Sequence, residues 1–386
     1  MSLNGFSIPR VSVATTVLLL GILAFAGPTL SAKGGGRSPP KNVPMKIKVA
    51  AIGVATIDGK VEDNYKRALE LVDEAAKDKP DLILLPEAFA AGYCADELTP
   101  YGETFDTSPY LKEFVARSQK YDCMIIMGIL EKRSDGLHNV AAIIDRGEII
   151  GRHSKSTLWP DNARPYRDER VLVGSGPGRE AFDTRFGRIG ILICYENMVP
   201  RAYMGFKGKA DLIVSPYNCE DDPSRHNTGG CGTAGVPSIW ADRTGMFYRG
   251  KTAPMQVNPG TSGLCETSGK IISKTRVGVE GIATGTLEIT PRAKRDNTAN
   301  ITGAAGKEHT RISLRRIAGD EPEPALPAAE TDGNGNFLLQ HVPPGTYEVI
   351  AQTADAAGKA SRPVVIKADS KVVAYEIGSI SLSARK

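Results

Sequence analysis

From Lys46 to about Ile289, short apolar runs alternate with segments whose apolar residues recur at helical spacing. The run from Lys46 to Val54 suits a buried strand, and apolar residues then recur at helical intervals from Val61 to Ala76. The Lys79-Pro80 pair ends that helix, and Asp81 to Leu85 reads as the next buried strand. Alternation of this kind predicts an α/β domain.

The same alternation continues further along the chain. It predicts a helix over Leu111 to Lys120, a strand over Cys123 to Leu130, a hairpin of strands 140–145 and 148–153, and a strand that starts near Ile189 and stops at Cys194. Open α/β sheets place their chemistry where buried strands end. Polar residues that follow these strands are therefore the first candidates for a functional site.

The pattern changes after this first domain, residues 46–290. Residues 291–300 are polar and basic, which favours a linker. Turn-forming residues at 332–337 and 343–348 then separate alternating strand-like runs. The sequence predicts a second domain over residues 301–386, a small all-β sandwich.

The first 32 residues resemble a cleavable leader rather than folded protein. Arg10 precedes an apolar run from Val17 to Ala24, and small residues around Ala26 follow. This is the layout of a secretory signal; an uncleaved signal anchor is the alternative, although the run is shorter than the roughly 20 residues that span a bilayer. Residues 33–45 favour a flexible tether. We expect an exported protein (periplasmic, extracellular or cell-surface) with no stable membrane span after cleavage.

Composition narrows the possible partners. The 386 residues are 41% hydrophobic and 24% charged, enough for a full core, so the chain reads as globular. The net charge of +4 comes from 48 basic and 44 acidic residues spread along the sequence, without a basic stripe. Nucleic acid is therefore not an expected partner.

The cysteines and histidines do not form a recognisable metal pattern. Five histidines are scattered without metal-ligand spacing, so neither a metal nor a cofactor is predicted. The six cysteines are widely spaced. Cys219 and Cys231 flank a polar loop. Two interpretations stay open: the pair forms a disulfide, or both are buried free thiols.

Three polar residues follow predicted strands. Cys194 precedes a helix-compatible segment, where free backbone N–H groups would stabilise a thiolate. Glu87 follows an apolar strand, where partial loss of water raises a carboxyl pKa toward a range suited to proton transfer. Lys155 could lower the thiol pKa and stabilise an oxyanion. Taken singly, Cys194 could equally be an ordinary buried cysteine, Glu87 an ordinary loop glutamate and Lys155 an ordinary exposed lysine.

Their surroundings are more specific. The segments are Pro86-Glu87-Ala88-Phe89-Ala90-Ala91-Gly92-Tyr93, Lys155-Ser156-Thr157-Leu158-Trp159-Pro160 and Gly187-Arg188-Ile189-Gly190-Ile191-Leu192-Ile193-Cys194-Tyr195-Glu196. In this order they resemble the motifs of the carbon-nitrogen hydrolase (nitrilase) superfamily over residues 46–289. The resemblance implies a four-layer αββα fold and a catalytic triad of Glu87, Lys155 and Cys194.

The resemblance also implies supporting roles. Glu131 would be the auxiliary glutamate that positions Lys155 and the substrate; the alternative is a surface glutamate paired with a neighbouring cation. The backbone N–H of Tyr195 would join Lys155 in an oxyanion pocket. Glu196 would help to shape the site or be structural. Family members commonly pair near the nucleophile, so a homodimer or higher homo-oligomer is expected.

The expected reaction is hydrolysis of a small amide through a Cys194 thioester, without a cofactor. Tyr195 after the nucleophile favours amidase-like branches, whereas residues 169–176 resemble the nitrilase branch, so nitrile hydrolysis stays open. An acyltransferase and a non-catalytic exported binding protein on the same fold are the rival classes. The C-terminal part resembles the carboxypeptidase regulatory-like β-sandwiches through residues 332–337 and 344–347.

Overall fold

The computed structural model describes residues 42–92, 101–160, 168–199, 201–247, 256–293, 295–306, 308–318, 325–368 and 370–384. The expected signal, residues 33–41 of the expected tether, Tyr93 and Cys94 lie outside these residues. Within them, no helix is long and apolar enough to cross a membrane.

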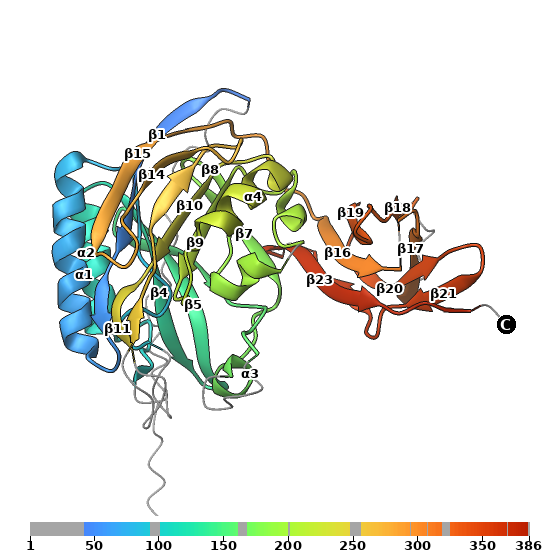
Figure 1. Ribbon diagram of the computed structural model, residues 1–386, viewed down its shortest axis with the longest axis horizontal. Helices are drawn as coiled ribbons and strands as arrows, with labels where there is room; N and C mark the ends of the chain where they lie inside the picture. The colour runs from blue at the N-terminus through green and yellow to red at the C-terminus, as the bar shows by residue number, and fades with distance from the viewer. Residues whose placement is uncertain are drawn as a thin grey trace, which may run out of the picture. The chain divides into compact units, whose positions relative to one another are not determined.

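The first sheet has six strands and is built almost entirely from the N-terminal half of the domain (Figure 1). Its order is β15 (Gly281–Ile289), β1 (Met45–Gly53), β3 (Leu82–Leu84), β4 (Met124–Arg133), β5 (Gly136–Asp145) and β6 (Glu148–Ser154). Two helices, α1 (Val61–Ala75) and α2 (Pro109–Lys120), cover one face (Figure 1). Ser108 caps α2 by accepting a hydrogen bond from the Leu111 amide at 3.1 Å.

The second sheet has nine strands and extends into the C-terminal part of the chain. Its order is β14 (Ile271–Lys274), β13 (Gly263–Cys265), β10 (Ser238–Asp242), β9 (Leu212–Tyr217), β8 (Gly187–Ile191), β7 (Arg179–Thr184), β23 (Val372–Ile380), β16 (Ala299–Ala305) and β19 (Asn336–Val342). A separate three-stranded sheet joins β12 (Gln256–Asn258), β11 (Thr244–Phe247) and β2 (Ala55–Ile57).

Three hydrophobic cores define the layers. Apolar residues of β1, β3, β4 and β5 meet those of β8, β9, β10 and β13 in one core, so the two sheets pack face to face. The other face of the first sheet packs on α1 and α2. The other face of the second sheet packs on the short helix η5 (Met204–Phe206) and on α4 (Ser224–Ala234). The order helix, sheet, sheet, helix follows, and the predicted α/β class is confirmed.

The strands after residue 299 form two sheets around a further shared core. Besides β16, β19 and β23, this part contains β17 (Arg311–Ala318), β18 (Ala329–Glu330), β20 (Gly345–Gln352), β21 (Ala356–Lys359), β22 (Val364–Ile366) and β24 (Ser383–Ala384). The expected linker, residues 291–300, is anchored by its backbone. The amides of Arg292 and Ala293 donate to Asp211 at 2.7 and 2.8 Å, and β16 already begins at Ala299.

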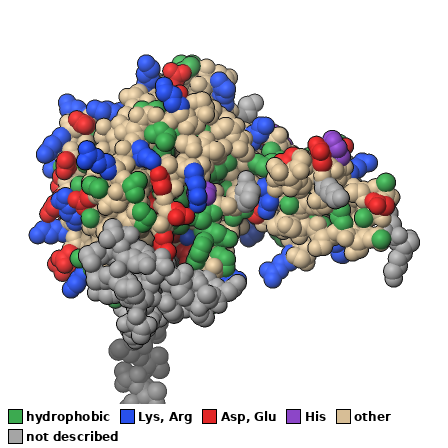
Figure 2. All heavy atoms as spheres, viewed as in Figure 1, with side chains coloured by type: hydrophobic (Ala, Val, Ile, Leu, Met, Phe, Trp, Pro, Cys, Tyr) green, Lys and Arg blue, Asp and Glu red, His purple; other side chains and the backbone are tan. Residues whose placement is uncertain are grey.

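Acidic and basic side chains are interspersed over the face shown in Figure 2. Most predicted elements of the first domain appear within a few residues of their expected ends. The segment after Cys194 differs, because it is a five-residue 3-10 helix, η4 (Cys194–Met198), rather than a full α-helix. The polar stretch after Asn218 contains α4 instead of a continuous loop.

Candidate active site

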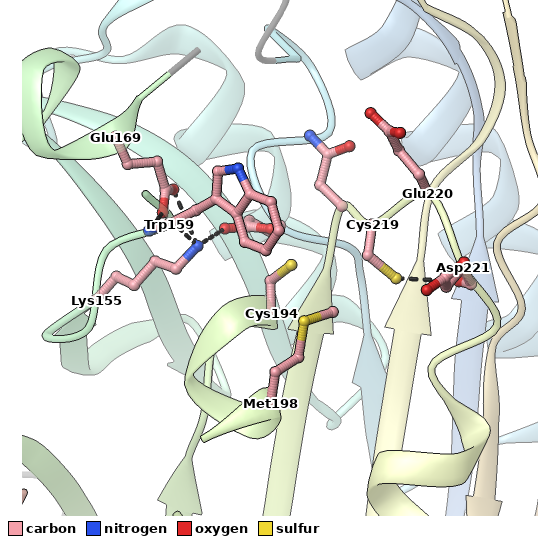
Figure 3. A pocket seen from close by; sticks show the side chains of 10 residues that line it. Lys155, Trp159, Glu169, Cys194, Met198, Cys219, Glu220 and Asp221 are labelled. Atoms are coloured by element: carbon pink, nitrogen blue, oxygen red, sulfur yellow. Dashed lines mark hydrogen bonds and ion pairs between the residues drawn. The ribbon is translucent and has the colours of Figure 1, made fainter. Parts of the chain in front are cut away.

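The ends of several strands converge on one cavity of about 260 Å³ (Figure 3). Glu87 follows β3, Lys155 follows β6, and Cys194 follows β8 as the first residue of η4. The described residues that line the cavity are Glu87, Lys155, Trp159, Glu169, Cys194, Met198, Asn218, Cys219, Glu220 and Asp221. The structure therefore brings together the three residues expected to form the triad, together with a second buried glutamate, Glu169.

Glu87, Lys155 and Glu169 form an ion cluster, called here the open cluster because all three line the cavity. Lys155 Nζ lies 2.8 Å from Glu87 Oε1 and 2.8 Å from Glu169 Oε2. Asn139 Nδ2 donates to Glu87 at 2.6 Å and to Glu169 at 3.1 Å. The Lys155 ammonium is only 2% exposed, so these carboxylates replace the water that it loses on burial.

The environment changes the proton affinities of the open cluster. Burial raises the pKa of Glu87, while the charge of Lys155 partly opposes that shift. Burial would lower the pKa of Lys155, but the charges of Glu169 and Glu87 outweigh it and raise the pKa of this ammonium. Lys155 thus stays a cation, and Glu87 becomes a better proton acceptor than an ordinary carboxylate.

Cys194 has a backbone conformation rare for a residue with a side chain. Its φ is +44°, in the left-handed region, and such outliers concentrate at functional sites. Burial raises the pKa of its thiol well above the usual value; Glu87 adds to the shift, while Lys155 and the Asn218 N–H oppose it. The expected helix N-terminus is a five-residue 3-10 turn, and burial opposes the thiolate form there.

The position of Glu87 depends on a glycine in the next strand. A Cβ added at Gly128 of β4 would overlap the backbone of Pro86 and Glu87. The Gly128 amide instead donates to the Pro86 carbonyl at 3.1 Å, and the Glu87 amide donates to the Tyr217 carbonyl of β9 at 3.1 Å. These contacts from both sheets fix the backbone that carries the carboxylate.

A second ion cluster contacts the backbone next to the nucleophile. His153 on β6 lies between two glutamates, with Nδ1 3.0 Å from Glu180 and Nε2 3.1 Å from Glu196. Both His153 and Glu196 are fully buried, and neither borders the cavity. We call His153, Glu180 and Glu196 the closed cluster.

Glu196 connects two loops of the site. Its Oε2 accepts from the Ile193 amide at 2.8 Å, and its Oε1 accepts from the amide and hydroxyl of Ser156 at 2.8 and 2.6 Å. Burial would raise the Glu196 pKa, but His153 and these hydrogen bonds lower it to about 2. Burial would lower the pKa of His153, but Glu196 and Glu180 raise it to about 9. The expected role of Glu196 in shaping the site is an indirect one.

Glu131 does not contact Lys155, and the expectation that it positions this lysine is wrong. Its carboxylate accepts from Arg133 Nε at 2.7 Å and pairs with Arg152. The reason is strand alternation, since residues of β4 with the parity of Glu131, such as Ile129, face the core under α1 and α2. Glu169 takes the place expected for Glu131.

Glu169 was missed by reasoning from the sequence. It begins the short helix α3 (Glu169–Leu172), and the amide of Trp159 donates to its Oε2 at 2.6 Å. The signal was present in the segment that starts at Glu169, which resembles the nitrilase branch, but no carboxylate role was assigned there. Tyr195 does not border the cavity; its ring packs edge-on against Trp159, with centroids 5.0 Å apart.

Among the described residues, no group of three or more histidine, cysteine or acidic side chains is arranged to hold a metal ion. Within the cavity, the Lys155 cation lies between the Glu87 and Glu169 carboxylates, and the Cys194 thiol lines the same space. A family model for carbon-nitrogen hydrolases matches residues 48–251, which include all of these groups. The chain belongs to the carbon-nitrogen hydrolase family.

Similar proteins within this family carry different activity names. The chain is 28% identical over 183 residues to a nitrilase of Pyrococcus abyssi, covering 45% of this chain and 65% of the relative. It is 27% identical to a citrullinase of Francisella tularensis, covering 46% and 63%, and 27% identical to an omega-amidase of Saccharomyces cerevisiae, covering 48% and 69%. The match thus spans just under two thirds of the first two relatives.

Solved structures of the family share the fold. A yeast member of branch 10 of the nitrilase superfamily superposes with a TM-score of 0.53 at 22% identity, covering 64% of this chain and 91% of its own. A carbon-nitrogen hydrolase superfamily protein of Xanthomonas campestris gives 0.54 at 16% identity, covering 63% and 90%. At these identities the likeness concerns the fold alone.

Proposed function

We propose that the protein hydrolyses a carbon-nitrogen bond of a small amide, with Cys194 as nucleophile, Glu87 as proton shuttle and Lys155 as charge stabiliser. The observation that carries the proposal is the open cluster beside a buried thiol in one cavity. A neutral thiol needs a base, and a buried carboxylate of raised pKa can take its proton and return it.

The reaction follows in two stages. Glu87 accepts the thiol proton as Cys194 attacks the carbonyl carbon, and Lys155 stabilises the oxyanion. The proton held by Glu87 passes to the leaving nitrogen, which departs as ammonia or an amine. Water, deprotonated by Glu87, then attacks the thioester, releasing the carboxylic acid and regenerating the thiol.

Glu169 supports this chemistry without exchanging the proton. It shares Lys155 and Asn139 with Glu87, so it holds the ammonium in place during both stages. With both carboxylates ionised, the open cluster carries a net negative charge, and the transfer of a proton to Glu87 neutralises it. Glu87 can therefore hold the proton while Cys194 is bonded to the substrate.

The cavity supports a substrate of modest size. Its volume of about 260 Å³ lies near the lower end of small-molecule pockets. Trp159 and Met198 offer apolar surface, whereas Glu220 and Asp221 offer polar groups (Figure 3). Asn218 adds a further polar group to the lining. A short acyl chain against the first two side chains would leave polar substituents facing the others.

The test is ammonia release from matched amides and nitriles, measured for the full chain, for Cys194→Ala and for Cys123→Ala. Cys123 is a matched control because its thiol is buried in the core under α1 and α2. We expect release from amides, its loss by roughly 10⁴-fold or more in Cys194→Ala, and activity retained in Cys123→Ala. An acyl adduct on Cys194 by intact mass supports the thioester.

Other results would redirect the proposal. Turnover of nitriles alone would favour a nitrilase, and an acylated amine as product would favour a transferase. Ligand binding without turnover or adduct would favour a binding protein on this fold. We further propose that residues 1–32 direct export; an intact N-terminus on the protein outside the producing cell would contradict cleavage of this segment.

A further inference from the structure

Two cysteines outside the catalytic cavity face each other between α4 and the face of the second sheet that α4 covers. Cys231 on α4 and Cys265 at the end of β13 have their Sγ atoms 3.0 Å apart, across 34 positions of the sequence. Both side chains are fully buried. The possible bond between Cys219 and Cys231 is not what the structure has, because Cys219 Sγ instead contacts the Asp221 carbonyl at 3.0 Å and Asp242 at 3.2 Å.

We propose that Cys231 and Cys265 form a disulfide when the chain folds in a compartment that supplies a disulfide oxidant. A disulfide holds its sulfurs about 2.05 Å apart, so side-chain movements of about 1 Å close the bond from the observed contact. Of the cysteines that the structure describes, these two alone face each other across a sulfur-sulfur contact.

The reaction balances as a thiol-disulfide exchange. The Cys231 and Cys265 thiols become one disulfide, and a small disulfide such as oxidised glutathione is reduced to two thiols. The electrons pass to that oxidant and the two protons end on the thiols it releases. A thiol buried in the finished fold reacts slowly, so the bond forms while α4 and β13 come together.

The bond would fasten one wall of the cavity. Residues 218–221 line the cavity, and α4 begins three residues later. Within α4, Asn227 already holds Tyr217 and Tyr203 at 3.1 and 3.0 Å. A covalent link from α4 to β13 lowers the conformational entropy of the unfolded chain, and this stabilises the folded state. This proposal does not depend on the reaction proposed for the cavity.

The experiment compares the full chain refolded with a glutathione redox buffer and with dithiothreitol. Each sample is denatured, alkylated, weighed intact and mapped as unreduced peptides. We expect the oxidised sample to lack two alkyl groups and to give a peptide that joins Cys231 to Cys265. Glutathione on Cys194 would appear as a separate mass and does not interfere. Alkylation of all six cysteines, or a bond to Cys94 or Cys219, would overturn the proposal.

Variants test the same bond through stability. Cys231→Ser and Cys265→Ser are each expected to lose the joined peptide, whereas Cys123→Ser keeps it. Reduction should lower the Tm of the wild type and of Cys123→Ser by about 5 °C or more, and leave both other variants unchanged. An equal Tm for oxidised and reduced wild type would contradict the stabilising bond. Because the wild type alone gives this result, the test does not require the variants to fold.

Discussion

The open and closed clusters have the same arrangement of charges but different surroundings. Each places one cation between two glutamates, and their cations, Lys155 and His153, are only two residues apart. The open cluster borders the cavity, whereas no member of the closed cluster does, and Glu180 lines a separate surface hollow instead. Charge composition alone therefore does not distinguish a catalytic group from a supporting one. We expect access to the cavity to make this distinction, and substitutions should separate the two clusters.

The largest expected effect is on turnover in the open cluster. Glu87→Gln keeps the size of the side chain but removes the base, and we expect kcat/KM to fall by roughly 100- to 10,000-fold. Thermal unfolding should change far less. Glu180→Gln is the matched control in the closed cluster, and an equal loss of turnover in both variants would erase the distinction between them.

Stability should be affected most in the closed cluster. Glu196→Gln leaves the buried His153 with one carboxylate and weakens the connection between Ile193 and Ser156. Breaking a buried ion pair costs about 3–5 kcal/mol, so the free energy of unfolding by urea should fall by about that much. A variant as stable as the wild type would show that the closed cluster is not a structural support.

A smaller change is expected from Glu169→Gln. The amide can still accept from Lys155 but has no charge, so Lys155 is held less firmly and turnover should fall by up to roughly 100-fold. Glu131→Gln provides the comparison, because its arginine partners are outside the cavity. If Glu131→Gln lost more turnover than Glu169→Gln, the assignment of Glu169 would be wrong.

The smallest effect is a pH dependence of stability. The folded pKa of His153, about 9, lies above its ordinary value of 6.5, so the stabilisation is complete below pH 6.5 and is lost as the pH rises toward 9. The Tm should therefore fall over this interval. His153→Gln should show a flatter profile between pH 6.5 and 9, and a profile parallel to that of the wild type would contradict a charged His153.

The local sequence pattern predicted the helices and strands of this fold better than it predicted which elements contact one another. The periodicity from Val61 to Ala76 and the helix α1 agree closely because amphipathic spacing is a local property. The choice between Glu131 and Glu169 is not local. Alternation along β4 groups Glu131 with Ile129, but only the tertiary structure shows that this face packs on helices rather than facing the cavity.

The contacts of the expected linker, residues 291–300, are not local either. A polar segment at residues 291–300 is typical of a linker, yet its amides bind Asp211 and the following strands continue the second sheet. The pairing of β7 with β23 could not be inferred from strand-like sequence, since register between distant strands depends on contacts made only in the folded chain.

That pairing also sets an order on biosynthesis. The edge of β7 finds its partner only when Val372 and Ala374 have been synthesised, long after β7 itself. Until then a ribosome-bound or truncated polypeptide carries an unpaired strand edge, which invites pairing with other chains. Protection of this edge of β7 is therefore coupled to synthesis of β23, and a chain truncated before Val372 would keep an exposed strand edge.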